Sequence, residues 1–104
     1  MLQAWLLVQR GHAVANGVPV ITVNRVGSEK DSSGMLEGIH FWGHSFVVGA
    51  QGEFLAHAGE EETTLHVEID LEAGSEIRKI WPFLRDRRIE QYGCLEKRYC
   101  DEEA

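Results

Sequence analysis

Val18-Pro19-Val20-Ile21-Thr22-Val23 is a short run, rich in β-branched residues and almost continuously apolar. Such a run predicts a strand buried on both faces, as in the middle of a layered protein of helices and sheets. Pro19 suits the first residues of this strand because it lacks an amide donor. A strand of this kind needs cover on both faces and a partner along each edge.

The segment before this strand, from Leu2 to Asn16, has the spacing of a helix. Residues at three- and four-residue steps predict one less polar stripe along it: Trp5, Val8, His12 and Ala15. Gly17 supplies the end of the helix, because glycine tolerates the positive φ found just past a helix.

Beyond the strand, residues 27–38 are rich in Gly, Ser and charged residues, which predicts a long loop. Residues 41–48 and 53–58 predict two further strands, and the turn at 49–52 joins them as a hairpin.

Apolar and polar residues alternate from Leu65 to Ile69, which predicts a half-buried strand. A helix is expected from Leu71 to Ile80, ending at Trp81 because Pro82 disfavours helical geometry in the residue before it. The predicted order is helix, strand, hairpin, strand, helix, a layered α/β (α+β) arrangement. These elements are too few to cover the strand at 18–23, so it either packs against another chain or belongs to a larger domain.

Length and composition set further limits. The chain has 104 residues, enough for one domain, with 43% apolar and 26% charged residues, as in soluble globular proteins. Its formal charge of −7 argues against nucleic acid or an anionic membrane as the main partner. No apolar run is long enough for a membrane span, and the N-terminal one is too short for a signal peptide, so a cytoplasmic location is expected.

The cysteines and histidines give little sign of a reactive or metal site. Cys94 and Cys100 lie close to the C-terminus and are expected to be reduced, solvent-facing thiols. His40 and His44 are four residues apart, but the strand context and Gly43 remove the helical face that this spacing needs. We therefore predict structural or surface histidines and no metal site.

Five linked segments resemble the C-terminal part of the nitrilase superfamily of carbon–nitrogen hydrolases, in order and with sensible spacing. They are QRGHAVANG (9–17), VITVNRVG (20–27), FWGHSF (41–46), GEFLA (52–56) and WPFLRDRRI with Tyr92 (81–92). The resemblance covers nearly the whole chain. The last segment and FWGHSF look most like those of N-carbamoylputrescine amidases, which would place the chain in polyamine biosynthesis.

The resemblance implies a four-layer α-β-β-α sandwich, of which residues 1–104 would be an incomplete C-terminal segment. It also implies a cysteine nucleophile, a lysine and two glutamates, all located before residue 1 in the complete enzyme. It implies a small carbamoyl-amine or amide substrate and no metal or organic cofactor. Neither cysteine here, nor Lys30 or Lys79, lies where the family has a catalytic residue, so no catalytic residue is expected and the chain alone should be inactive.

Other residues have two interpretations each. Asn24 and Arg25 leave the end of the central strand and are candidates for the substrate-pocket wall, although a structural ion pair or subunit contact is the favoured interpretation of Arg25. Phe41 and Trp42 are either pocket wall or core.

The tail combines arginines with aromatic side chains, and we expect it to form a subunit interface or to dock on the rest of the enzyme. The residues expected there are Trp81, Phe83, Arg85, Arg87, Arg88 and Tyr92. Two functions follow: a segment of an amide hydrolase, or an interaction module that pairs with itself or with a separate N-terminal half.

Overall fold

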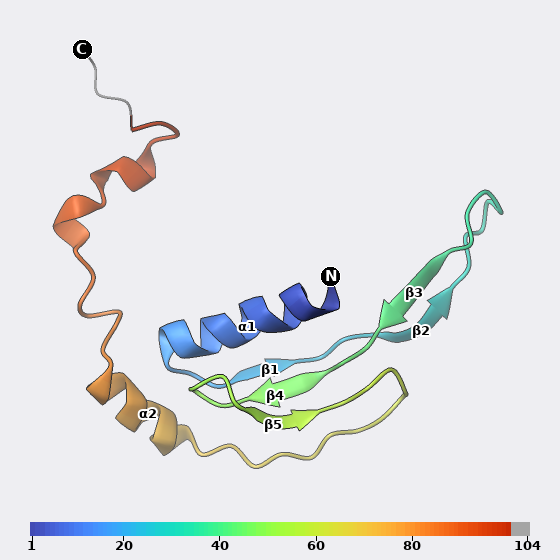
Figure 1. The fold of residues 1–104 in the computed structure, drawn as a ribbon, viewed down its shortest axis with the longest axis horizontal. Helices are drawn as coiled ribbons and strands as arrows, with labels where there is room; N and C mark the ends of the chain where they lie inside the picture. Colours follow the sequence, from blue (N-terminus) through green and yellow to red (C-terminus); the bar gives the residue numbers. More distant parts are fainter. Residues whose placement is uncertain (101–104) are drawn as a thin grey trace.

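The computed structural model describes residues 1–100, and its helices and strands follow the predicted order with some additions (Figure 1). The elements are α1 (Leu2–Asn16), β1 (Val20–Thr22), β2 (Val26–Glu29), β3 (Ile39–Trp42), β4 (Phe46–Val48), β5 (Phe54–His57), α2 (Leu71–Ile80) and the short 3-10 helices η1 (Ile89–Gln91) and η2 (Gly93–Glu96). Both α-helices have the predicted bounds.

Helix α1 ends where expected, at Gly17, whose φ of 61° is left-handed. The predicted stripe is wrong, because Val8, His12 and Ala15 are exposed while Leu6 and Ala13 are buried. The helix carries apolar residues on more than one face, so periodicity alone does not choose between them. Leu6 and Ala13 pack instead with Phe46 and Val48 in the core, and the Ala13 carbonyl accepts from Val18 N–H to close the end of the helix.

The core lies between α1 and a three-stranded antiparallel sheet in the order β1-β4-β5. The predicted hairpin is confirmed as β4–β5, and Phe46 and Val48 of β4 are fully buried against α1. The core cluster and its flanking residues are Leu6, Ala13, Phe46, Val48, Leu2, Trp5 and Val20.

Strand β1 is an edge strand, and its predicted burial on both faces is wrong for this chain. Its only hydrogen-bonded partner among the described residues is β4. Ile21 points away from α1 and is 64% exposed, and Val23 is 87% exposed. The composition is that of a central strand, but the elements that would cover it are not among residues 1–100.

The predicted strand 41–48 is instead two strands, β3 and β4. Gly43 and His44 both have left-handed φ values, 63° and 58°, which breaks the extended backbone between them. The predicted loop 27–38 is shorter than expected, because its first residues belong to a strand. Strand β2 pairs with β3 from Val26↔Trp42 to Glu29↔Ile39, so a second hairpin projects from the sheet (Figure 1).

Residues 65–69 have the predicted alternation of burial but form no strand. Leu65, Val67 and Ile69 are half-buried while His66 is exposed, and the segment is extended alongside β5 (Figure 1). No backbone ladder joins it to another described segment. Its pattern is thus that of a strand lacking a partner.

Helix α2 follows directly, and Asp70 caps it by accepting from the backbone N–H groups of Glu72 and Ala73 at 3.0 and 3.3 Å.

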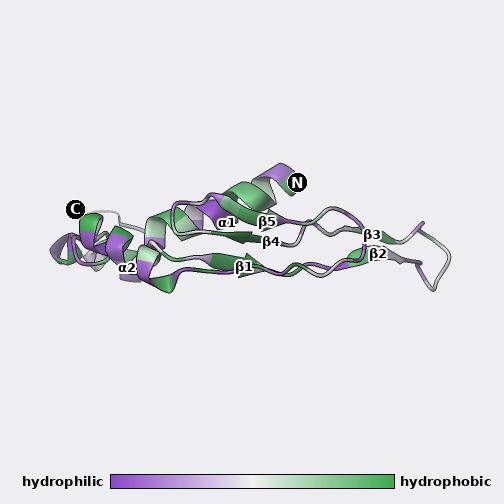
Figure 2. Cartoon of the chain, turned by 90° about the horizontal axis from the view of Figure 1, so that it is seen from below, coloured by the Kyte–Doolittle hydropathy of each residue, from purple (hydrophilic) through white to green (hydrophobic). Residues whose placement is uncertain are grey.

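The chain exposes far more surface than a compact protein of its size. Its accessible surface of 8806 Å² exceeds by about 2900 Å² the area expected for a compact monomer of 11.7 kDa. Its radius of gyration is 19.5 Å, where about 13 Å is expected. Seen edge-on, the molecule is a thin layer, and strands β1, β4 and β5 carry the colour of apolar residues (Figure 2). No described helix is long and apolar enough to cross a membrane.

Candidate functional site

Asn24 is a structural brace at the point where the two sheets diverge. Its side-chain amide donates to Gly43 O at 2.8 Å, and its backbone N–H donates to Ser45 Oγ at 2.8 Å. Gly43 is required here, since a Cβ at this position would lie 2.7 Å from both Gly59 O and a Val26 methyl. These bonds fix the exit of β1 against the kink between β3 and β4.

Arg25 is held at the surface by two partners. Its guanidinium lies over the Phe41 ring, 4.1 Å from the centroid, and Nη1 lies 2.7 Å from Glu29 Oε2. More than half of each charged side chain is exposed, so the pair contributes about 1 kcal/mol or less. The structural ion pair that was one interpretation of Arg25 is therefore present.

The four predicted pocket-wall residues do not share one wall. Asn24 and Arg25 line a groove on the uncovered side of the sheet, together with Ile21, Val23 and Leu65. Phe41 and Trp42 are outside that groove, and as neighbours in β3 they point to opposite faces.

The Trp42 ring approaches Trp5 of α1 at 5.9 Å between centroids, and its Nε1 is buried without a hydrogen-bond partner in the described chain. Trp42 is therefore half-buried against Trp5, with one donor left unsatisfied.

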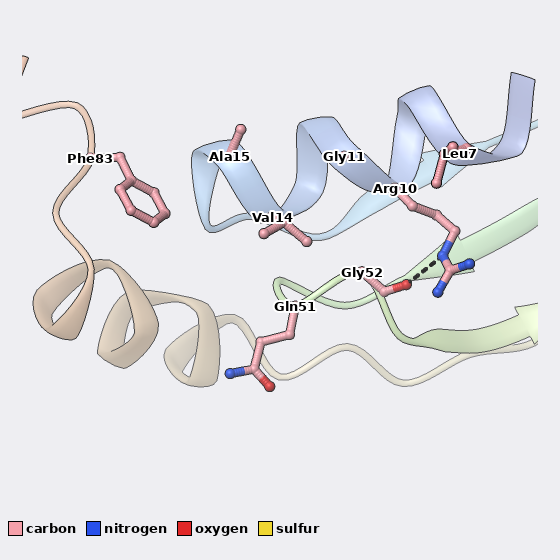
Figure 3. A pocket seen from close by; sticks show the side chains of 8 residues that line it. All are labelled: Leu7, Arg10, Gly11, Val14, Ala15, Gln51, Gly52 and Phe83. Atoms are coloured by element: carbon pink, nitrogen blue, oxygen red, sulfur yellow. Dashed lines mark hydrogen bonds between the residues drawn. The ribbon is translucent and has the colours of Figure 1, made fainter. Parts of the chain in front are cut away.

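A second groove runs beside α1, on the side of the β4–β5 turn (Figure 3). Val14 and Ala15 lie along the helix, Gln51 lies on the turn, and the Phe83 ring approaches from the tail. Arg10 closes one end, donating from Nε to Gly52 O at 2.8 Å. The groove is mostly apolar and open.

The tail residues predicted to form an interface are exposed. Trp81 and Phe83 stack with ring centroids 6.1 Å apart, and both rings keep about half of their surface free. Two of the arginines pair with neighbouring acids, Arg85 with Asp86 and Arg88 with Glu90. The hydrogen bond from Arg85 to Asp86 raises the pKa of the arginine further, so its charge is permanent.

The two cysteines correct a prediction. Cys94 and Cys100 are joined in a disulfide, and no described cysteine is free. The prediction rested on there being only two cysteines, both close to the C-terminus. The turn formed by η2 brings the two Cα atoms within 5.5 Å, inside the range that a disulfide spans. Neither sulfur is a thiolate in this structure. Lys30 is exposed, and Lys79 pairs with Glu76 at 2.9 Å.

The structure reveals one contact that sequence reasoning missed. His44 Nδ1 lies 3.0 Å from His57 Nε2, although the residues are 13 positions apart. Burial lowers the pKa of His57, and the neighbouring His44 lowers it further. The hairpin register alone could have suggested that the two lie near each other.

Comparison with known proteins shows which protein family this chain belongs to. Residues 1–79 match the family model described as carbon–nitrogen hydrolase. The chain is 44% identical over 94 residues to omega-amidase NIT2-A of Xenopus laevis, covering 90% of this chain and 32% of that protein. It is 42% identical over 94 residues to N-carbamoylputrescine amidase of Solanum tuberosum, covering 88% and 31%. The chain therefore spans about a third of the length of these relatives.

A solved structure has the same fold. The crystal structure of a carbon–nitrogen hydrolase from Helicobacter pylori G27 superposes with a TM-score of 0.88 and 60% sequence identity. The match covers 94% of this chain and 34% of that one.

Proposed function

Because the chain belongs to the carbon–nitrogen hydrolase family, we propose that it is the C-terminal third of an amide hydrolase and works only with the rest of that enzyme. The observation that carries this proposal is the exposed apolar surface. Ile21 and Val23 line an open groove, and the alternating segment 65–69 has no partner strand. The excess surface of about 2900 Å² on this chain is large enough for its side of a permanent interface, which buries about 2000–5000 Å² counted over both partners.

The proposed substrate is a carbamoyl amine, N-carbamoylputrescine, which the complete enzyme would convert to putrescine, ammonia and carbon dioxide. Support comes from the segments FWGHSF and WPFLRDRRI and from the plant relatives that carry this name. The omega-amidases of similar identity support a second substrate class, a terminal amide. Both reactions break a carbon–nitrogen bond outside a peptide.

In this proposal the chain contributes the scaffold and none of the reacting groups. The nucleophilic cysteine, the lysine and the glutamates belong to the part of the enzyme before residue 1. Asn24 fixes the end of β1 by its hydrogen bond to Gly43 O, and Arg25 lines the uncovered groove next to it. A cytoplasmic location and the absence of a cofactor remain predictions.

The test is a hydrolysis assay on the purified chain with N-carbamoylputrescine and with an omega-amide. We expect no ammonia release from the chain alone. We expect release after the first two-thirds of the Helicobacter pylori relative is added as a separate polypeptide. Turnover by the chain alone would refute the proposed division of labour. A folded, inactive complex would refute the proposed substrates.

The alternative is a non-catalytic interaction module, and the exposed tail favours it. Trp81 and Phe83 lie beside the open groove along α1, so a second copy or a separate N-terminal half would cover them. Sedimentation of the chain at several concentrations distinguishes the two. Self-association that Phe83→Ala weakens supports the module, and a monomer at all concentrations contradicts self-pairing.

A further inference from the structure

We propose that His44 and His57 form a binding site for one divalent transition-metal cation of the Zn²⁺, Ni²⁺ or Cu²⁺ class, with water completing the coordination. The observation behind it is the approach of His44 Nδ1 to His57 Nε2 at 3.0 Å across the end of the β4–β5 hairpin. This inference does not depend on the proposed amidase function.

The distance suits a shared cation. Two imidazole nitrogens, each about 2.0–2.1 Å from one metal ion, lie roughly 2.8–3.4 Å apart for coordination angles between square and tetrahedral. In the metal-free pair, one nitrogen must carry a proton that the other accepts. A bound cation lies off the line between the two nitrogens. The ring that donated shifts its hydrogen to its other nitrogen, so the two hydrogens are then on His44 Nε2 and His57 Nδ1.

The backbone holds both rings in position. His44 has a φ of 58° and is the only residue other than glycine with positive φ in the described part of the chain. This conformation is uncommon for a side-chain-bearing residue. It is fixed by the hydrogen bond from His44 N–H to Gly59 O at 3.0 Å, and Ala58 N–H donates to Ser45 O at 2.8 Å beside it.

The Phe54 ring stacks on His57 with centroids 4.7 Å apart and planes 5° from parallel. The two ligands are therefore preorganised from opposite sides of one hairpin.

The ligand chemistry selects the class of cation. Neutral imidazole suits Zn²⁺, Ni²⁺ and Cu²⁺, whereas Mg²⁺ and Ca²⁺ prefer oxygen ligands. No group of three or more potential ligands exists among residues 1–100, so the protein supplies two. The nearby His40 is engaged elsewhere, with Ser28 at 3.0 Å and Glu60 at 3.4 Å.

The test titrates the full 104-residue chain with ZnCl₂, NiCl₂ and CuCl₂ by calorimetry at pH 7.5, with MgCl₂ as the negative control. We expect one ion per chain, Cu²⁺ the tightest of the three, and no binding of Mg²⁺. His44→Gly and His57→Gln should each weaken binding by at least about tenfold. The matched controls His12→Ala and His66→Ala, which alter exposed histidines outside the pair, should leave it unchanged.

His44→Gly is the sharper variant because glycine suits a φ of 58°, so the fold should survive loss of the ligand. Circular dichroism checks this. Histidine NMR of the unmodified chain provides a second readout, in which Zn²⁺ should shift the ring signals of His44 and His57 first. Absence of one-to-one binding overturns the proposal. So does full affinity in both variants, or a first shift at any other histidine.

Discussion

Replacing Val23 by aspartate should weaken the association of this chain with the rest of an enzyme while leaving the stability of the chain itself almost unchanged. Val23 is 87% exposed and lines the groove on the uncovered sheet face. In the chain alone, the change should alter the free energy of unfolding by no more than about 0.5 kcal/mol, as for other surface substitutions. When a second layer covers the groove, burying a valine contributes about 1.5–3 kcal/mol.

An unpaired carboxylate in that position adds a desolvation penalty. Together these effects predict a loss of at least about 3 kcal/mol in association, which is more than about a hundredfold in affinity. The assay is calorimetric titration of the chain with the first two-thirds of the Helicobacter pylori relative. Met35→Asp is the matched control, because Met35 is 85% exposed but lies outside the groove. Equal affinities for the two variants would refute the claim that this face is an interface.

Three further tests, using five substitutions, address the packing and electrostatics of the chain. Phe46→Ala should lower the free energy of unfolding, measured by urea titration, by about 3–5 kcal/mol because Phe46 is fully buried. Phe83→Ala should lower it little because Phe83 is about half exposed, and equal losses for the two variants would contradict the assigned core. Gly17→Ala should destabilise by about 1–2 kcal/mol, since φ is 61° there and the new Cβ would lie 2.7 Å from Arg78 Cγ. Gly11→Ala, within α1 and free of neighbours, should stabilise by up to about 1 kcal/mol, and the opposite order of the two melting temperatures would contradict the assigned geometry. The pKa of His57 is lowered in the folded chain, so the unfolded state binds a proton more readily. The contribution of His57 to stability should therefore be full above pH 6.5 and fall as the pH drops below it. If the melting temperature of a His57→Gln variant varied with pH as steeply as that of the parent, His57 would be excluded as the cause.

Local signals in the sequence predicted the elements well wherever one residue decides the geometry. Gly17 ends α1 and Pro82 follows the end of α2, and both helices have the predicted bounds. The β4–β5 hairpin was predicted from its turn residues and is confirmed.

The errors arise where tertiary context decides. The stripe along α1 was assigned to the wrong face because the helix is apolar on several sides, and only the sheet selects Leu6 and Ala13. The strand expected at 41–48 breaks at His44, a residue type with no strong preference for positive φ. Its side chain meets His57 only because the hairpin folds back.

Of the four residues predicted for the substrate-pocket wall, Asn24 and Arg25 line the groove at the end of β1, and Phe41 and Trp42 lie outside it. Their place in the substrate pocket of a complete enzyme stays a prediction. Sequence spacing cannot tell which face of β3 a side chain occupies without knowing its partner strand.

Hydrogen exchange of the backbone amides at residues 65–69 tests the central claim most directly. These residues have the burial pattern of a strand but no partner strand in the described chain. We predict exchange close to that of an unstructured peptide in the chain alone, and strong protection after the first two-thirds of a related enzyme is added. Protection already present in the isolated monomer, or none gained in the complex, would contradict the claim that this chain is one part of a larger sandwich.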